Sequence, residues 1–184
     1  MEKYRPDELI EMLSGESRLE RKNAAQRICE LTKNDGEMFV DFCPEIIDAI
    51  NRPEAQTRWE CINALSVIAK VNQKAVKKAL PLMEDAVFDE KHNMLIVAAF
   101  NFLCSYGAIS KKNSNDTWAL IHDAIEFYNG EIIFDQMLDC LMVFANGKVD
   151  PSVKKELLKD LDFCKVSAFG ATVTRISNVV KKLK

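Results

Sequence analysis

Long apolar runs are missing from this chain. No stretch approaches the roughly 18 residues that cross a bilayer, and the first residues, MEKYRPDEL, lack the basic and apolar regions of a secretory signal. We therefore expect a cytoplasmic protein with no membrane partner. Glycine and proline are also scarce, at six and five residues, while 48% of the residues are hydrophobic and 29% are charged. This composition lies far from that of disordered chains and predicts one folded domain over residues 1–184.

Sequence motifs of known catalytic sites are absent as well. The chain has no G-x-S-x-G elbow, no P-loop and no glycine-rich dinucleotide turn. Its two histidines, His92 and His122, lie far apart and lack the spacing of metal ligands. Asp135 and Asp139 share one helix face, but such a pair is more typical of a solvated acidic face than of an acid and base pair. We predict a protein that is not an enzyme and that has no catalytic residue, no metal and no cofactor.

The cysteines do not form metal or disulfide motifs. None of the six belongs to a C-x-x-C pair. Because cysteine behaves as a small buried hydrophobe in a reducing compartment, we expect these residues to pack in the core. Four lie inside apolar helical stretches and two lie near helix ends: Cys29, Cys61, Cys104 and Cys140, then Cys43 and Cys164.

Charge is unevenly distributed along the chain. The net charge is −3, but residues 37–147 sum to −7 and residues 148–184 sum to +5. The negative net charge argues against non-specific nucleic-acid binding, because such binding relies on Lys and Arg that neutralise phosphates. Within the basic end, Lys154, Lys155 and Lys159 are the candidate patch for an acidic partner. The alternative is that these lysines belong to a solvated end cap, since cations suit helix C-termini.

One helical pattern occurs twice near the start of the chain. The segment RKNAAQRICELTKN at residues 21–34 aligns with RWECINALSVIAKV at residues 58–71, at an offset of 37 residues. Apolar positions that recur every three or four residues, repeated at such a period, are typical of stacked helical hairpins. Two apolar columns continue this pattern through the chain: Ile28, Leu65, Phe100, Leu141 and Ile176, and then Leu31, Ile68, Leu103, Phe144 and Val179.

Turn and breaker residues divide the chain into ten helices that pair in order, and no segment alternates in the manner of a strand. We expect the polar run KKNSND at residues 111–116 to be a surface loop that holds an insertion. We also expect the last helix to begin near Val166 and to pack a face that includes Phe169 and Ile176. The predicted helices span residues 5–14, 17–34, 37–51, 54–72, 74–88, 91–107, 117–129, 131–146, 151–163 and 166–183.

Two segments resemble the consensus of the HEAT-repeat family of armadillo-like α-solenoids, in which a turn precedes an arginine, two small residues and a spaced pair of large aliphatic residues. They are PEAQTRWECINALSVIA at residues 53–69 and ESRLERKNAAQRICEL at residues 16–31. The resemblance implies an all-α fold, a right-handed α-solenoid of about five HEAT-like antiparallel helix pairs. It also implies that Arg21 and Arg58 are structural contacts between neighbouring repeats.

HEAT arrays most often serve as interaction scaffolds, so the resemblance implies a protein or peptide partner on the concave face that the second helices line. Residues displaced from the apolar columns form a nearly neutral stripe on these helices, apolar in its middle. A patch of this kind is typical of a peptide groove, with Phe102 as the predicted hot spot. The alternative is that the third repeat is buried. The predicted contact residues are Asn63, Lys70, Leu95, Phe102, Gln136 and Asp139.

A nucleic-acid-binding or base-repair solenoid is the alternative function, because some DNA glycosylases use HEAT-like helical pairs with a Trp and an Asp near the damaged base. The chain offers Trp59, Trp118 and Asp139 for these roles. The stripe is not basic, however, and both tryptophans suit packing between helices. We therefore expect a protein or peptide rather than nucleic acid as the partner, and a monomer or weak homo-oligomer.

Overall fold

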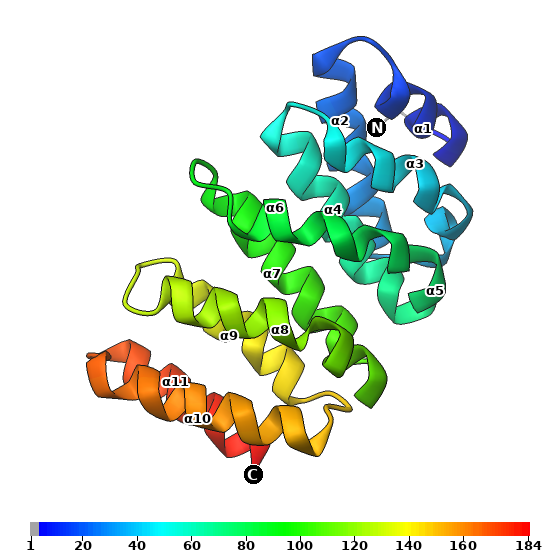
Figure 1. Ribbon diagram of the computed structural model, residues 1–184. Helices are drawn as coiled ribbons and strands as arrows, with labels where there is room; N and C mark the ends of the chain where they lie inside the picture. The colour runs from blue at the N-terminus through cyan, green and yellow to red at the C-terminus, as the bar shows by residue number, and fades with distance from the viewer. Residues whose placement is uncertain (1–3) are drawn as a thin grey trace. The chain divides into compact units, whose positions relative to one another are not determined.

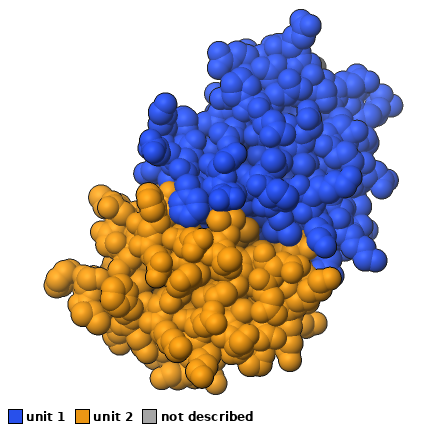
Figure 2. All heavy atoms as spheres, in the orientation of Figure 1, with its two compact units in different colours: residues 1–102 blue, residues 103–184 orange. Residues whose placement is uncertain are grey.

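The computed structural model describes residues 4–184, and over this range the chain forms helices and no strand (Figure 1). It divides into two compact units, residues 1–102 and residues 103–184, called unit 1 and unit 2 (Figure 2). The division falls inside helix α7. The expectation of a single domain over residues 1–184 stays a prediction.

Unit 1 contains the first two helix pairs and most of the third. The first helices of the second and third pairs are broken into short α and 3-10 segments around Pro44 and Pro81, because proline lacks the N–H that a continuous helix needs. The elements of this unit are, in order, α1 (Pro6–Ser14), α2 (Arg18–Thr32), a 3-10 helix (Glu37–Phe42), α3 (Cys43–Asp48), a 3-10 helix (Ala49–Asn51), α4 (Ala55–Val71), α5 (Gln73–Val76), a 3-10 helix (Lys77–Leu82), α6 (Met83–Val87) and α7 (Asn93–Gly107), whose end belongs to unit 2.

Unit 2 contains the last two pairs as unbroken helices. They are α8 (Lys111–Tyr128), α9 (Phe134–Ala145), α10 (Pro151–Ser167) and α11 (Ala171–Leu183). The described chain therefore forms five helix pairs, and the predictions of an all-α fold and of about five pairs are confirmed.

The two predicted apolar columns form the core of each unit. In unit 1, α2 packs along α4, and Ile28, Leu65 and Ile68 are fully buried. In unit 2, α9 packs along α11, and Leu141 and Ile176 are fully buried there. Burying a side chain of this size stabilises a fold by about 1.5–3 kcal/mol. The repeated columns therefore account for the stacking of successive pairs within each unit.

All six cysteines are buried and free, which confirms the prediction of core packing. Burial raises the pKa of the Cys29 thiol to about 12 and that of the Cys43 thiol to about 11. Because only the thiolate is a strong nucleophile, these side chains act as packing groups at neutral pH.

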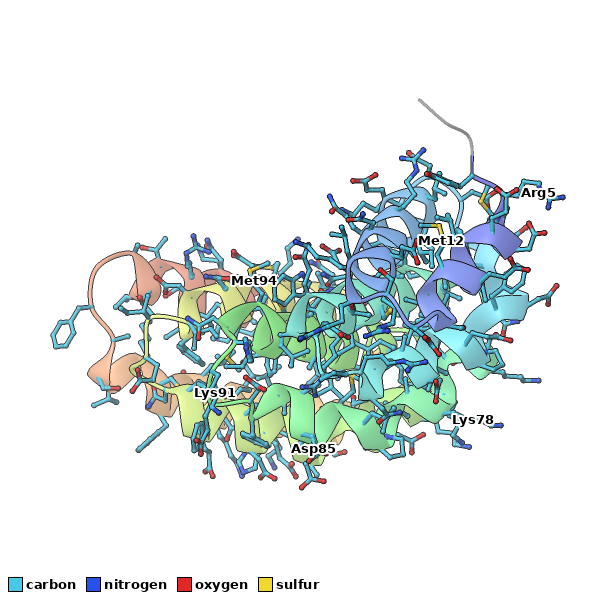
Figure 3. The ribbon with its side chains drawn as sticks, turned by 90° about the horizontal axis from the view of Figure 1, so that it is seen from above. Arg5, Met12, Lys78, Asp85, Lys91 and Met94 are labelled. Carbon is cyan, nitrogen blue, oxygen red and sulfur yellow. The ribbon has the colours of Figure 1, made fainter. Side chains whose placement is uncertain are left out.

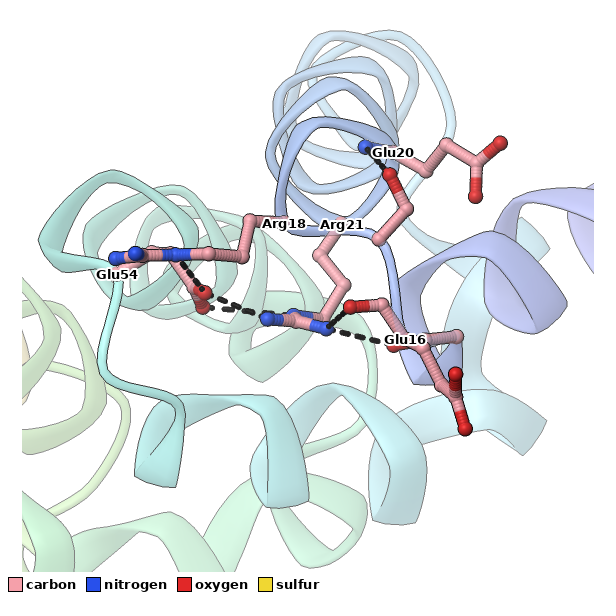
Figure 4. A network of polar contacts seen from close by, with 7 residues as sticks. Glu16, Arg18, Glu20, Arg21 and Glu54 are labelled. Carbon is pink, nitrogen blue, oxygen red and sulfur yellow. Dashed lines mark hydrogen bonds and ion pairs between the residues drawn. The ribbon is translucent and has the colours of Figure 1, made fainter.

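Arg21 links the first pair of helices to the second. Its Nη1 donates to the carbonyl oxygens of Gly15 and Glu16, at 2.8 and 2.7 Å, in the turn between α1 and α2. Its Nη2 donates to Oε1 of Glu54, at 2.6 Å, at the start of α4 (Figure 4). Arg21 is 7% exposed, so it makes these contacts from inside the fold. A structural role for Arg21 is confirmed.

Arg58 repeats this arrangement one pair later. Its Nε donates to the carbonyl oxygen of Ile50 at 3.0 Å, and its Nη1 lies 3.8 Å from Oδ2 of Asp89. Asp89 precedes α7 and accepts hydrogen bonds from the backbone N–H groups of Lys91 and His92. Burial raises the pKa of Asp89, but these hydrogen bonds and that of the His92 ring outweigh burial and hold the pKa below its ordinary value.

The first and second helices of the third pair expose different sides of unit 1. Seen from above, Lys78 and Asp85 point outward on one side, and Met94 of α7 points outward on the opposite side (Figure 3). All three side chains are exposed. The face formed by second helices is therefore separate from the face formed by first helices.

The expectation of a loop at residues 111–116 is wrong, because α8 begins at Lys111. Ser110 caps the helix by accepting a hydrogen bond from the N–H of Asn113 at 3.2 Å. The polar side chains satisfy backbone groups: Asn113 donates to the carbonyl of Tyr106 at 3.1 Å, and Ser114 donates to that of Lys111 at 2.7 Å. The longer repeat is thus accommodated by a longer helix.

The expectation that the last helix begins near Val166 is also wrong. Helix α10 continues to Ser167, and α11 begins at Ala171 after Gly170, which has a φ of 57°. A positive φ suits glycine and breaks the helical path. Val166 and Phe169 are consequently exposed, whereas Ile176 is buried as predicted.

Candidate functional site

The second helices of unit 1 present one polar face. It comprises the stripe predicted from the sequence on α2 and α4, and it lies opposite the buried columns. Its members on α2 are exposed, and those on α4 are half-buried except for the exposed Lys70. We call this surface the amide face, and its residues are Asn23, Gln26 and Glu30 on α2, Lys33 directly after α2, and Glu60, Asn63, Val67 and Lys70 on α4.

Side-chain amides are the central feature of the amide face. The offset of 37 residues that aligns α2 with α4 pairs Gln26 with Asn63. The Gln26 amide contacts Glu30 through a long hydrogen bond of 3.4 Å. Trp59, one turn before Asn63 on α4, donates its Nε1–H to Glu60 at 3.3 Å and is half-buried. The face therefore has three amides, lies beside an aromatic ring and has no excess of either charge.

The third repeat does not supply the predicted apolar patch. Leu95 and Phe102 of α7 are both fully buried, and Ala98 and Ser105 on the same stripe are buried too. The prediction that Phe102 is an exposed anchor is therefore wrong, and so is the prediction that Leu95 is an exposed contact residue. Their side chains serve as core, because α7 is apolar on more than one face and the side that carries them is buried.

The second helices of unit 2 present a more polar face. Gln136 and Asp139 of α9 are both exposed, as predicted. Asp139 accepts a hydrogen bond from Nη1 of Arg175 at 2.5 Å, and Asp135 accepts one from Thr172 at 2.7 Å. Asp139 is thus already paired with a cation on the neighbouring helix α11. A role of Gln136 and Asp139 in partner binding stays a prediction.

The predicted acidic-partner patch lies on α10. Lys155 and Lys159 are exposed and Lys154 is half-buried. Glu156 and Asp160 alternate with these lysines on the same helix. The cations are therefore interleaved with carboxylates, and binding of an acidic partner here stays a prediction.

Two polar pairs that the sequence interpretation missed join α8 to α10. Nδ1 of His122 lies 2.7 Å from Oδ2 of Asp160, and Nε1 of Trp118 donates to Glu156. The Trp118 and His122 rings lie 5.7 Å apart. Each pair joins residues 38 positions apart. Aligning the first helices of successive repeats at that offset is the signal that could have found them.

Replacing Asp160 by asparagine is expected to lower the pKa of His122. The hydrogen bond to Asp160 raises that pKa above its ordinary value of 6.5, against an opposing effect of burial and with smaller contributions from Glu126 and Asp123. Because the folded pKa is raised, the pair stabilises the fold fully below pH 6.5 and loses this effect as the pH rises through the raised value. An NMR titration of the His122 ring, assigned with His92→Gln, measures the shift. An identical titration in Asp160→Asn would contradict the pairing.

Within residues 4–184, no group of three or more His, Cys, Asp or Glu side chains is arranged to hold a metal ion. Over the same residues, no helix has both the length and the apolar character needed to cross a membrane.

No protein-family model matches the sequence, and a comparison with curated proteins found no match. Several solved structures, in contrast, have a fold similar to that of this chain. A designed armadillo repeat protein in complex with the peptide (KR)4 has a TM-score of 0.77 and 12% identity, over 96% of this chain and 81% of that chain. Computationally designed armadillo repeat proteins for modular peptide recognition give a TM-score of 0.75 and 12% identity, with the same coverage.

The complex of CpcE and CpcF of phycocyanin lyase from Nostoc sp. PCC7120 is also similar. Its TM-score is 0.63 and its identity 18%, over 95% of this chain and 96% of that chain. At these identities the likeness concerns the fold alone. The chain therefore has the fold of the armadillo and HEAT-like α-solenoids.

Proposed function

We propose that this protein is a non-enzymatic scaffold that binds a protein or peptide on the amide face, and that this face is the concave side of the repeats. One observation carries the proposal: Gln26 on α2 and Asn63 on α4 occupy equivalent positions in two neighbouring repeats, whose helices α2 and α4 pack against each other. Two proteins of similar fold support the proposal: one is a designed armadillo protein in complex with a peptide, and the other was designed for modular peptide recognition.

Side-chain amides suit an extended peptide. Each amide has both a donor and an acceptor, and so can bind the N–H and C=O groups that an extended backbone leaves unpaired. Gln26 and Asn63 would each bind one backbone unit, and the half-buried Trp59 would support a neighbouring side chain. Lys33 and Lys70 occupy equivalent positions at one end of the face and favour an acidic residue of the peptide there.

The charges of the amide face do not favour nucleic acid. Lys33 and Lys70 are balanced by Glu30 and Glu60 on the same face. Binding to a phosphate backbone draws its free energy from several unopposed cations. A cytoplasmic location and a monomer or weak homo-oligomer complete the proposal, and the six free cysteines support a reducing compartment.

Affinity capture from a lysate of the protein's own organism tests the proposal, with the double variant Gln26→Ala/Asn63→Ala compared against the unchanged chain. We expect a protein partner whose binding survives nuclease and weakens by about tenfold or more in the double variant, since two hydrogen bonds of about 1 kcal/mol each are lost. Mass spectrometry identifies the partner, and titration calorimetry with the purified partner measures the change.

Asn51→Ala is the matched control, because Asn51 is an exposed amide of unit 1 outside the amide face. It should bind the partner as the unchanged chain does. Equal binding by all three proteins would show that the amide face is not the binding surface. Recovery that disappears after nuclease would instead support the nucleic-acid alternative.

A further inference from the structure

Unit 2 carries an apolar surface at the turns that close its two helix pairs. The four most exposed large apolar side chains among residues 4–184 all lie there: Ile132 is 92% exposed, Val166 86%, Phe169 84% and Phe163 72%. Ile132 lies in the turn between α8 and α9, and the other three lie on α10 and in the turn that follows it. Figure 1 shows both turns at the same end of their helix pairs. We call this surface the turn edge.

Two hollows lie at this surface, and three of the four residues line them. One has a volume of about 210 Å³ and lies between the end of α8 and α10, with Phe163 in its wall. The other has a volume of about 300 Å³ and lies between the two turns, with Ile132 and Phe169 in its wall. Asn129 lines both hollows, so they are neighbours. A cavity of about 150 Å³ is enough to hold benzene, so each hollow can take one large apolar side chain.

The charges around the turn edge are acidic. On the α8–α9 side, residues 123–135 contain four carboxylates and no Lys or Arg, while on α10 Lys159 and Lys165 offset Asp160 and Asp162, so the surface is acidic on balance. Glu126 lines the first hollow together with Asp160, and Glu131 lines the second together with Asp135. A surface of this kind attracts cations and repels the anionic headgroups of a membrane.

We propose that the turn edge is a second docking surface, which binds a cationic peptide segment of a partner protein through two large apolar side chains. The apolar anchors fill the two hollows, and Lys or Arg residues beside them meet the exposed carboxylates of Glu126 and Glu131. Exposed apolar patches with a charged rim mark interaction sites, and the complementary charge selects the partner. This surface is separate from the amide face and does not depend on the function proposed for it.

A short fluorescent peptide of leucine and lysine, in amphipathic helical order, is the probe. We expect it to bind the full chain, and we expect the double variant Phe163→Ser/Phe169→Ser to bind at least about tenfold more weakly, because both anchors lose their apolar walls. A matched peptide with glutamate in place of lysine should bind far more weakly than the lysine peptide. Glu131→Lys should weaken binding of the lysine peptide, and more so at low salt.

Three controls keep the result specific. Leu19→Ser removes an exposed leucine of unit 1, and Gln26→Ala/Asn63→Ala alters the amide face; both should bind the lysine peptide normally. Circular dichroism checks that each variant is folded. Binding that is unchanged in Phe163→Ser/Phe169→Ser, or equal for the two peptides, would overturn the proposal.

Two other occupants are separate outcomes. Sedimentation velocity of the protein alone would reveal a dimer, and a dimer that Phe163→Ser/Phe169→Ser disperses would assign the turn edge to a second copy of this chain. Co-sedimentation with phosphatidylcholine vesicles, abolished by the same variant, would assign it to a membrane. Either result would overturn a cationic peptide as the occupant.

Discussion

The Arg21→Ala variant is expected to be less stable than the unchanged chain by about 3 kcal/mol, because the largely buried Glu54 then keeps only the exposed Arg18 as its cation and two backbone carbonyls lose their donor. Arg21 holds Glu54 and two backbone carbonyls from a position that is 7% exposed. Alanine leaves all three acceptors without this donor. Urea unfolding at neutral pH measures the loss, and hydrogen exchange should locate it in α1, α2 and α4.

Arg18 provides a matched control within the same network. It donates to the same Oε1 of Glu54, at 3.0 Å, but its side chain is 74% exposed (Figure 4). Exposed ion pairs contribute little, so Arg18→Ala should change the free energy of unfolding by less than about 0.5 kcal/mol. Equal effects of the two variants would show that Arg21 does not act as a buried link between pairs.

The pH dependence gives a second measure of the Arg21 pair. The hydrogen bond from Arg21 lowers the pKa of Glu54 below its ordinary value of 4.5. Because this folded pKa is lowered, the pair stabilises the fold above pH 4.5 and loses that effect as the pH falls through the lowered value. The difference between the unchanged chain and Arg21→Ala should therefore shrink in acid.

Gly147→Ala is the second variant for which we expect a large loss of stability, and here the cause is steric. A Cβ at Gly147 would lie 2.5 Å from the Cα of Ala108 and in contact with its carbonyl oxygen. That oxygen also accepts a hydrogen bond from the N–H of Lys148 at 2.8 Å, so the two backbones are tied together. Because backbone cannot rotate away, we expect a loss of about 3 kcal/mol, or roughly 6–12 °C in the melting temperature.

Gly130→Ala is the contrasting control in the same unit. Gly130 has a φ of 89°, and a Cβ there would meet nothing within 4 Å. Its replacement should cost only about 1 kcal/mol, from backbone strain. Ala108→Gly should not rescue Gly147→Ala, because the clash with the Ala108 backbone remains. Thermal unfolding that ranks Gly130→Ala as the more damaging change would contradict the close approach at Gly147.

The two glycines show what local sequence can and cannot predict. Asn129-Gly130 is a turn signal, and the positive φ of Gly130 agrees with it. Gly147 also follows an asparagine at the end of a helix, so the sequence predicts a helix end at both places. Only the packing of Gly147 against Ala108, 39 positions earlier, makes a side chain at Gly147 so unfavourable.

The same division applies to the candidate sites. The repeat offset correctly places Gln26, Asn63 and Gln136 outside the core, because helical periodicity decides which face of a helix is buried. It places Phe102 on the same stripe, and there it fails, since the third repeat is buried on that side too. The turn edge was missed because Val166 and Phe169 fit the apolar spacing of a helix that in fact begins at Ala171.

The sequence by itself determined the helical class, the pairing of helices and the two core columns, because these depend on a periodicity that recurs within each repeat. Tertiary structure alone decided which apolar residues remain exposed, which polar pairs form across repeats, such as His122 with Asp160, and where glycine is required by a neighbour. The polar pairs and the glycine requirement depend on residues 38 or 39 positions away, as with His122 and Asp160 or Gly147 and Ala108, and such contacts leave no mark in the local pattern.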